Sequence, residues 1–218
     1  MQKILFVTYQ FPPRGGPGVQ RSLNFVKHLR ENGYDPIVLT VNESDIKNGG
    51  CLWDDSLLKQ LPSDIEIVGT PSFEPIRLIK FLMKLRLYRF AWFFFYRFFW
   101  EWSARWPYKV YDTAEKIIKK NDIKLVYTSS SPFSSMILGK LLKERMGVKW
   151  IADLRDPFTD AYAWNFPSKL HWYLSRSFEK KYFSLPDKLI VNTPEVKKLY
   201  HERNLIDEKK IICVTNGY

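Results

Sequence analysis

Three charged side chains at or just beyond the end of an apolar run could take part in proton transfer or phosphate binding. Asp153, Arg155 and Asp156 follow Trp150-Ile151-Ala152. A carboxylate there can accept a proton from a hydroxyl or orient it, and an arginine can pair with a phosphate or lock the loop. The alternative is a structural Asp–Arg pair that closes the loop, with Asp153, nearest the strand, as its structural member. We take Asp156 as the candidate catalytic carboxylate and Arg155 as a candidate substrate-binding residue.

A glycine-rich loop lies near the start of the chain, between an apolar run and a helical pattern. Gly15 and Gly16 lie within it, and Arg21 follows in the helical pattern. Glycine lets the backbone approach a ligand closely, and the free amides at a helix N-terminus attract phosphate. The loop matches neither G-x-G-x-x-G nor a Walker loop, so the glycines could also serve only a tight turn. We interpret Gly15, Gly16 and Arg21 as candidate substrate-binding residues.

Hydroxyl groups gather in a third loop, Ser129-Ser130-Ser131-Pro132. Ser131 is a further candidate substrate-binding residue, although capping of a helix that begins at Pro132 would explain one serine. Tyr162 and Trp164, with Asp156 and Asp160, could line a groove for a sugar acceptor, because aromatic faces stack on sugar rings.

Apolar runs of strand length alternate with helical patterns along the whole chain. Such alternation predicts βαβ units, in which a mostly parallel sheet carries helices on both faces and binds ligands at the carboxyl ends of its strands. The fold class predicted is therefore a Rossmann-like three-layer α/β/α domain. The expected strands are Lys3–Tyr9, Pro36–Val41, Ile65–Gly69, Leu125–Thr128, Lys149–Ala152, Lys188–Val191 and Ile211–Val214, and the expected helices are Val19–Asn32, Tyr108–Asn121, Pro132–Met146, Ser168–Phe183 and Pro194–Arg203.

Composition narrows the class of protein. The 218 residues are 45% hydrophobic and 26% charged, with a net charge of +11, so we expect a full core and a negatively charged partner or surface. Two cysteines without C-x-x-C spacing and three histidines exclude a disulfide framework and make a metal site unexpected. The first apolar run ends in a turn and no cleavage site follows it, which indicates a first strand rather than a signal peptide. We therefore expect the protein to be in a reducing compartment.

A basic aromatic segment, Ile76–Trp106, carries 13 of the chain's 36 aromatic residues, seven basic residues and a single acid. Its longest uncharged run, Phe90–Tyr96, is too short to span a bilayer. Its two polar stripes do not align along one helix, so we expect two amphipathic helices with a bend near Arg89–Ala91. Contact with an anionic membrane, plain packing on the sheet, and stacking with single-stranded nucleic acid remain open, the last being the weakest. The candidate membrane-contact residues are Arg77, Lys80, Lys84, Trp92 and Arg97.

Four motifs together resemble glycosyltransferase family 4, and specifically the amino-terminal, acceptor-side domain of that two-domain family. They are Phe11-Pro12-Pro13 with Gly15, Gly16 and Arg21; Ser131-Pro132-Phe133; Asp153-Leu154-Arg155-Asp156-Pro157; and Val214-Thr215-Asn216-Gly217-Tyr218. The resemblance implies one half of a GT-B fold, in which two Rossmann-like domains face each other and a sugar is transferred with retention, usually without metal. Gly15 and Gly16 match the loop near the donor phosphate. Asp156 falls where the family places a polar residue close to the reacting hydroxyl, and Arg155 precedes it.

The resemblance also implies partners and a place in the cell. Residues 1–218 would be one amino-terminal domain with residues 76–106 as a helical insertion, and the nucleotide-sugar domain would be absent from this chain, which we expect to be inactive alone. We expect a nucleotide-sugar donor, a cell-surface polysaccharide or lipid-linked acceptor, no metal, no nucleic acid, and a cytoplasmic location at the inner face of the plasma membrane. The alternative is a non-catalytic module that docks on anionic membrane or on a partner protein. A dehydrogenase is disfavoured because Glu43 is the nearest acid to the end of Pro36–Val41 and lies two residues beyond it.

Overall fold

The computed structural model describes residues 1–49, 51–72, 81–82, 84–87, 102–160, 166 and 168–216. Strands and helices alternate through these residues, as the sequence predicts. The strands are β1 (Gln2–Thr8), β2 (Tyr34–Val41), β3 (Ile67–Thr70), β4 (Leu125–Ser129), β5 (Lys149–Leu154), β6 (Lys188–Val191) and β7 (Ile211–Cys213). The helices are α1 (Pro17–Leu29), α2 (Glu43–Asn48), α5 (Trp106–Asn121), α6 (Ser135–Met146), α7 (Lys169–Tyr182) and α8 (Pro194–Glu202), with short 3₁₀ turns at Arg30–Asn32, Asp55–Gln60, Trp102–Arg105 and Glu208–Lys210.

Within the described residues, seven strands form a single sheet in the order β3-β2-β1-β4-β5-β6-β7, and each neighbouring pair is parallel. The chain winds outward from β1 in one direction to β3 and then crosses to β4 on the other side of β1. The strand order therefore reverses between β1 and β4, where Leu5 pairs with Val126 and Thr8 with Ser129. Open parallel sheets bind ligands at the carboxyl ends of the strands beside such a reversal.

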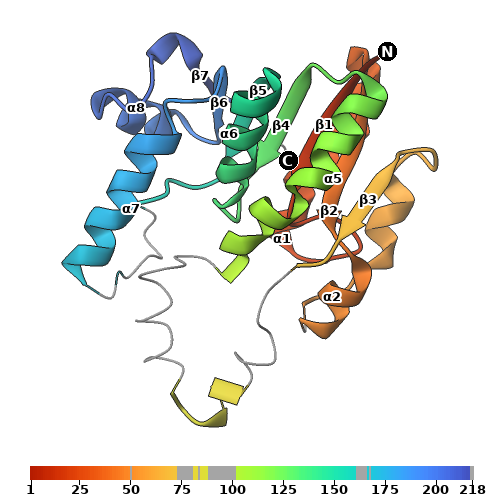
Figure 1. Ribbon diagram of the computed structural model, residues 1–218, viewed down its shortest axis with the longest axis horizontal. Helices are drawn as coiled ribbons and strands as arrows, with labels where there is room; N and C mark the ends of the chain where they lie inside the picture. Colours follow the sequence, from red (N-terminus) through yellow and green to blue (C-terminus); the bar gives the residue numbers. More distant parts are fainter. Residues whose placement is uncertain are drawn as a thin grey trace.

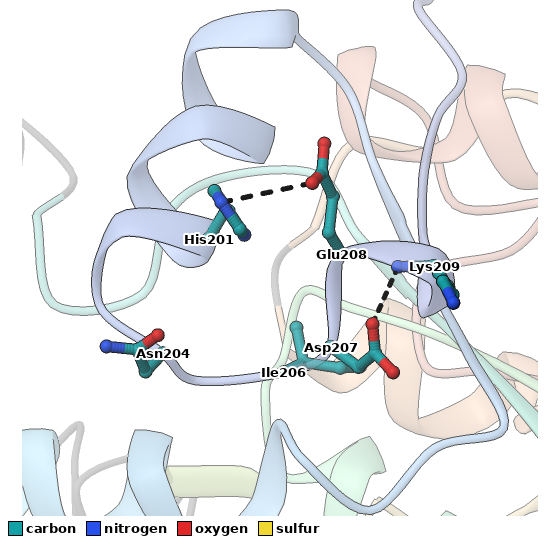
Figure 2. A pocket seen from close by; sticks show the side chains of 6 residues that line it. All are labelled: His201, Asn204, Ile206, Asp207, Glu208 and Lys209. Atoms are coloured by element: carbon teal, nitrogen blue, oxygen red, sulfur yellow. Dashed lines mark hydrogen bonds and ion pairs between the residues drawn. The ribbon is translucent and has the colours of Figure 1, made fainter.

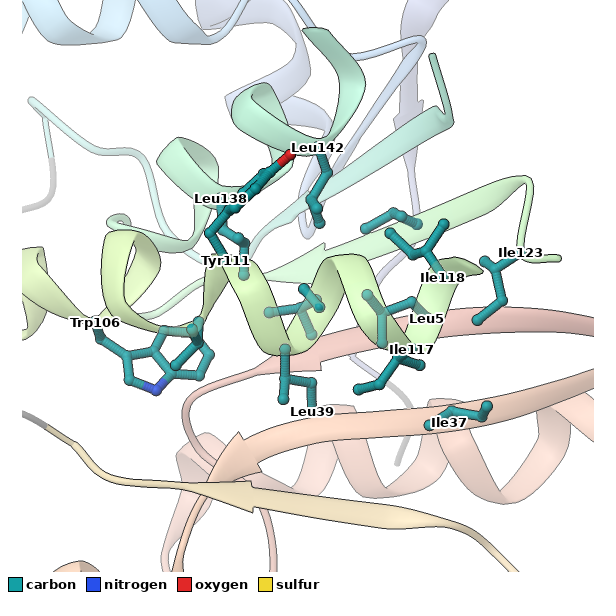
Figure 3. Packing of buried hydrophobic residues seen from close by; sticks show 14 of the residues in the cluster. Leu5, Ile37, Leu39, Trp106, Tyr111, Ile117, Ile118, Ile123, Leu138 and Leu142 are labelled. Atoms are coloured by element: carbon teal, nitrogen blue, oxygen red, sulfur yellow. The ribbon is translucent and has the colours of Figure 1, made fainter. Parts of the chain in front are cut away.

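One face of the sheet is covered by α5 and α6, which cross in front of it in Figure 1. Figure 3 shows the packing: Leu5 and Leu39 from the strands meet Ile117 and Ile118 of α5, and Leu138 and Leu142 of α6 extend the same cluster. Side chains at alternate strand positions reach opposite faces, so Phe6 lies on the other face, beside Val26 of α1. This face is closed by α1, and the Phe6 ring stacks on Tyr127 at 4.6 Å between centroids.

The predicted strands are confirmed to within two residues, but one helix start is wrong. Helix α6 begins at Ser135 rather than Pro132, and Ser131 does not cap it. Pro132 lies in the preceding turn, where its carbonyl oxygen accepts a bond of 3.0 Å from the Ser135 hydroxyl. The Thr193 cap of α8 is confirmed, because its hydroxyl accepts from the amide of Val196.

Most of the basic aromatic segment lies outside the described residues, including the expected bend near Arg89–Ala91. Its end is described: Trp106 opens α5, is fully buried, and donates from Nε1 to the Thr70 hydroxyl at 2.9 Å. Trp106 is thus a core residue, so at this end the segment packs on the protein, as one of the three open interpretations expected. No helix among the residues described is long and apolar enough to cross a membrane.

The close contact between α6 and β5 gives a test of the packing. A Cβ atom on Gly139 would lie 2.1 Å from the Trp150 indole, which is fully buried and donates to Thr128. Alanine normally stabilises a helix relative to glycine, but here we expect Gly139→Ala to lower the free energy of unfolding by about 3 kcal/mol through overpacking. Urea denaturation would measure it. As a control, Gly147→Ala meets only open space at φ 68° and should cost about 1 kcal/mol; equal losses would contradict the packing.

Candidate functional site

A buried ion pair joins helix α1 to the end of β5. The Arg21 guanidinium donates to the Asp153 carboxylate from Nε at 2.9 Å and from Nη2 at 2.8 Å. Both side chains are almost wholly buried. Burial alone would lower the pKa of Arg21, but the bond and the charge of Asp153 outweigh it and raise that pKa. The remaining nitrogen, Nη1, donates to the Asn216 side chain at 3.0 Å, so the pair also holds the segment that follows β7.

A second arginine lies beside this pair among hydroxyl groups. Arg155 donates from Nη2 to Ser22 at 2.7 Å and to Ser129 at 3.1 Å, and Ser22 in turn contacts Thr8 at 3.1 Å. These hydroxyls come from α1, β4 and β1, so Arg155 sits at the reversal of strand order. Burial lowers the pKa of Arg155, and its Nε is buried without a hydrogen-bond partner. The site therefore holds a cation with unused donor capacity.

The first turn of α1, which follows the glycine-rich loop, packs against the same arginine. Gly16 has φ 104°, a conformation that favours glycine, and it precedes the first residue of α1. A Cβ on Gly18 would lie 1.9 Å from the side-chain oxygen of Gln10 and 3.5 Å from Nη1 of Arg155. The loop that carries Arg155 and Asp156 is thus adjacent to the first turn of α1. Gly15 and Gly16 are half-buried and border solvent at the helix N-terminus.

A pocket of about 490 Å³ lies between α1 and the residues that follow β7. Its polar lining includes Arg21, Asn24, His28, Arg155, Thr215 and Asn216. Because Asp153 neutralises Arg21, the positive charge at this pocket comes from Arg155, and it suits an anionic or hydroxyl-rich ligand.

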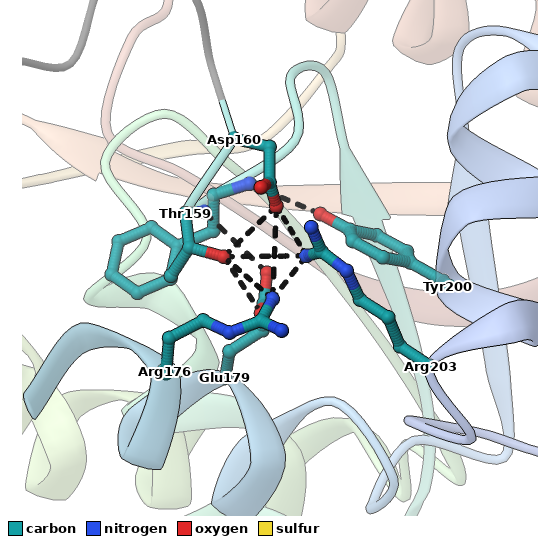
Figure 4. A network of polar contacts seen from close by, with 7 residues as sticks. Thr159, Asp160, Arg176, Glu179, Tyr200 and Arg203 are labelled. Atoms are coloured by element: carbon teal, nitrogen blue, oxygen red, sulfur yellow. Dashed lines mark hydrogen bonds and ion pairs between the residues drawn. The ribbon is translucent and has the colours of Figure 1, made fainter. Parts of the chain in front are cut away.

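Side chains of α7 and α8 clamp the loop after β5 through hydrogen bonds (Figure 4). The amide of Phe158 donates to the Tyr200 hydroxyl at 3.0 Å, and the Thr159 hydroxyl donates to Glu179 at 2.8 Å. Glu179 is fully buried, and burial raises its pKa even though Thr159, Arg203 and Arg176 act in the opposite direction.

Two arginines complete this clamp. Arg176 of α7 contacts Glu179 at 3.1 Å, and Arg203, which follows α8, forms an ion pair with Asp160. The contacts fix residues 158–160 and leave Asp156 exposed at the rim.

A second hollow, of about 380 Å³, lies at the opposite end of the sheet (Figure 2). It is formed by the end of α8 and the turn before β7, where His201 faces Glu208 at 3.9 Å. Both side chains are more than half exposed. No residue singled out in the sequence as a site residue lines this hollow, and it lies away from the carboxyl ends of the strands.

The structure brings together several of the residues selected from the sequence. Arg21, Arg155 and the glycine loop meet at one edge, Asp156 is exposed beside them, and Ser131 is half-buried in the loop after β4. Lys84 is exposed. The other candidate membrane-contact residues, Arg77, Lys80, Trp92 and Arg97, and the groove residues Tyr162 and Trp164 lie outside the described residues.

Sequence reasoning missed the partners of the charged residues. Asp153 is structural, as expected, but it pairs with Arg21 of α1 and not with Arg155. Ser22 and Thr8 carry no motif of their own, and the motif that contains Asn216 does not indicate that this residue binds Arg21. The pairing of β1 with β4, and of β4 with β5, brings the elements that carry these contacts together. A signal was available for Glu179, because a lone acid within the predicted helix Ser168–Phe183 falls on its inward face.

Comparison with known proteins identifies the family of the chain and solved structures with a similar fold. A family model described as Glycosyltransferase Family 4 matches residues 18–218. No curated protein sequence matches the chain. Among solved structures, a glycosyltransferase from Rickettsia africae is similar over 99% of this chain and 43% of its own, with 20% identity and a TM-score of 0.56. Sucrose-phosphate synthase from Thermosynechococcus elongatus is similar over 100% of this chain and 49% of its own, with 12% identity and a TM-score of 0.58.

A third similar structure is the UDP-GlcNAc 2-epimerase from Neisseria meningitidis, bound to UDP-GlcNAc, with 11% identity and a TM-score of 0.52 over 97% of this chain and 45% of its own. This chain therefore spans less than half the length of these structures. At such identities the likeness shows the fold, which is one half of the GT-B architecture, as the sequence predicts.

The buried ion pair predicts a large effect of removing one partner. Arg21→Met leaves the Asp153 carboxylate buried and unpaired, and we expect the free energy of unfolding to fall by about 3–5 kcal/mol. Adding Asp153→Asn should restore part of this loss, because the uncompensated charge is then gone. Urea denaturation would measure both variants.

The matched control is Arg30→Met, which breaks a more exposed pair with Asp35 and Asp64; it should lower the free energy of unfolding far less than Arg21→Met does, because solvent screens exposed ion pairs. If Arg21→Met cost no more than Arg30→Met, the central role of the buried pair would be wrong.

The clamp predicts a pH effect at Glu179. Because burial raises its pKa in the folded state, the free energy of unfolding should fall as pH rises from the unfolded value of 4.5 through the folded one. Glu179→Gln removes this dependence, so the stability of the variant minus that of the wild type should increase with pH across that window. Glu144→Gln, at an exposed pair with Lys140, should show no such rise. Parallel pH profiles for Glu179→Gln and the wild type would refute the prediction.

Proposed function

The chain belongs to glycosyltransferase family 4, and from that premise we propose that its 218 residues form the acceptor-binding half of a retaining glycosyltransferase. The observation that carries the proposal is that the first turn of α1 lies beside Arg155 at the carboxyl edge of the sheet, where a Cβ on Gly18 would be 3.5 Å from Nη1 of Arg155. Gly15 and Gly16 directly precede this turn, and the exposed Asp156 follows Arg155 in the loop after β5. Together they bring a helix N-terminus, a buried cation and an exposed carboxylate to one edge.

The donor would be a nucleotide-sugar, held mainly by a second domain. Gly15 and Gly16 directly precede α1, and the dipole of α1 favours the negative charge of a diphosphate at this end of the helix. Arg155 supports the same role, because its unpartnered Nε gives a buried positive charge beside this helix start. Arg21 contributes indirectly, since its donors are engaged by Asp153 and Asn216.

The acceptor hydroxyl would meet Asp156. Asp156 is exposed and sits on a loop that α7 and α8 clamp, so its carboxylate is held at the rim without being neutralised by a buried partner. In the transfer, the anomeric carbon exchanges its bond to the diphosphate for a bond to the acceptor oxygen, and the acceptor proton leaves. Asp156 would accept or orient that proton. Ser131, in the neighbouring loop, would bind the acceptor.

A cell-surface polysaccharide or a lipid-linked sugar is the proposed acceptor class. The strongly basic composition supports an acceptor or surface that carries negative charge. We further propose that the reaction needs no metal and takes place in the cytoplasm, at the inner face of the plasma membrane.

The test is transfer by the natural protein that contains these residues, supplied with UDP-, GDP- and ADP-sugars and a lipid-linked or polysaccharide acceptor. We expect one donor to yield a glycosylated product and free nucleoside diphosphate. Asp156→Asn should lower kcat by about 10²–10⁴-fold, the usual contribution of a general acid or base, with little change in stability because Asp156 is exposed.

The control is Asp112→Asn, at an exposed aspartate of α5, which should leave the rate unchanged. Absence of both transfer and nucleotide-sugar hydrolysis with every donor would refute the proposal. It would favour the alternative, a non-catalytic module that docks on anionic membrane or on a partner protein.

A further inference from the structure

Helix α7 turns a stripe of polar residues inward and leaves apolar residues exposed on its outer side, although Phe178 and Tyr182 pack on the core. The buried positions include His171, Ser175 and Glu179, four residues apart along one stripe. On the outer side, Leu170, Tyr173 and Leu174 are 51%, 63% and 44% exposed. A helix that packs on a protein core normally has the opposite arrangement. We therefore expect the outward apolar side chains to contact a binding partner.

The charges on α7 identify the chemistry of that partner. Lys169, Lys180 and Lys181 are all exposed. The only acid of the helix, Glu179, is fully buried and is bound by Thr159 and Arg176. The outer surface of α7 thus combines apolar side chains with lysines and carries no carboxylate. This combination is typical of helices that lie in the interface of an anionic bilayer.

A second described segment has the same character. Phe81, Leu85 and Leu87 are about half exposed, and Lys84 and Arg86 are exposed among them. In Figure 1 this segment and the first turn of α7 both lie beyond the carboxyl edge of the sheet. An acceptor bound at that edge would be on the side of the molecule from which both surfaces project.

We propose that the outer surface of α7, formed by Leu170, Tyr173 and Leu174 with Lys169, Lys180 and Lys181, docks on a lipid bilayer that contains anionic phospholipid. The apolar side chains enter the interfacial region, and the lysines contact headgroup phosphates. The inward contacts of Glu179 link this surface to the loop that carries Asp156. The inference rests on the proposed function only in that a membrane-bound acceptor would be presented at this surface.

The test is cosedimentation of the 218-residue chain with vesicles of phosphatidylcholine alone and of phosphatidylcholine with phosphatidylglycerol. We expect at least tenfold stronger partitioning to the anionic vesicles. Lys169→Gln, Lys180→Gln and Lys181→Gln combined should reduce that partitioning by about tenfold or more, since each cation near an anionic surface adds to the attraction. Leu170→Ser, Tyr173→Ser and Leu174→Ser combined should reduce it similarly.

Matched controls separate this surface from charge in general. Lys27→Gln, Lys59→Gln and Lys116→Gln combined remove the same charge from exposed positions on other elements and should change partitioning less than threefold. Thermal unfolding would establish that all variants are folded. Equal partitioning to both kinds of vesicle, or α7 variants that bind as well as the wild type, would overturn the inference. Either result leaves the transfer reaction untouched, because vesicle binding needs neither donor nor acceptor.

Discussion

The candidate site depends on a single constraint, which is that the buried charges of Arg21 and Asp153 must face each other. Removing either side chain would leave the other charge buried without a partner, so the pair fixes the position of α1 over the end of β5. Everything at the carboxyl edge follows from that placement. Ser22 comes within reach of Arg155, the start of α1 meets the loop after β5, and Asn216 is held against the helix. A short ion pair between distant parts of the chain thereby positions three loops.

Much of the fold could be predicted from the sequence because apolar runs report burial directly. Each expected strand lies within two residues of its place, and the alternation with helices predicts a parallel sheet whose ligand edge holds Gly15, Gly16 and Arg155. The pairing of charges could not be predicted in the same way. Asp153 and Arg155 are two residues apart in the sequence, yet Asp153 lies in β5 and Arg155 lies in the loop after it, and the two bind different partners. The pairing of Asp153 with Arg21 depends on the register of the sheet, which the sequence does not show. The helix start predicted at Pro132 was wrong because proline also occurs in the turn that precedes a helix.

Helix α7 shows how one element can serve two environments. Its inward side carries Glu179, which secures Thr159, and its outward side carries leucine, tyrosine and lysine. A buried carboxylate is costly in isolation, but here Thr159, Arg176 and the nearby Arg203 satisfy it. The loop bearing Asp156 is therefore held by polar bonds that specify direction, which apolar packing alone would not do. Phe178 and Tyr182 of α7 pack on the core, and Leu170, Tyr173 and Leu174 remain exposed for contact elsewhere.

The pairing of β1 with β4 also governs how the molecule must assemble during synthesis. Leu5 finds its partner at Val126, so the centre of the sheet cannot close until well over half of the chain has left the ribosome. Contacts so distant along the chain carry a loop-closure entropy that slows folding. Until then β1 can pair only with β2, whose parallel register is set through α1. The edge of β1 that later pairs with β4 would stay unpaired in the nascent chain for that whole interval.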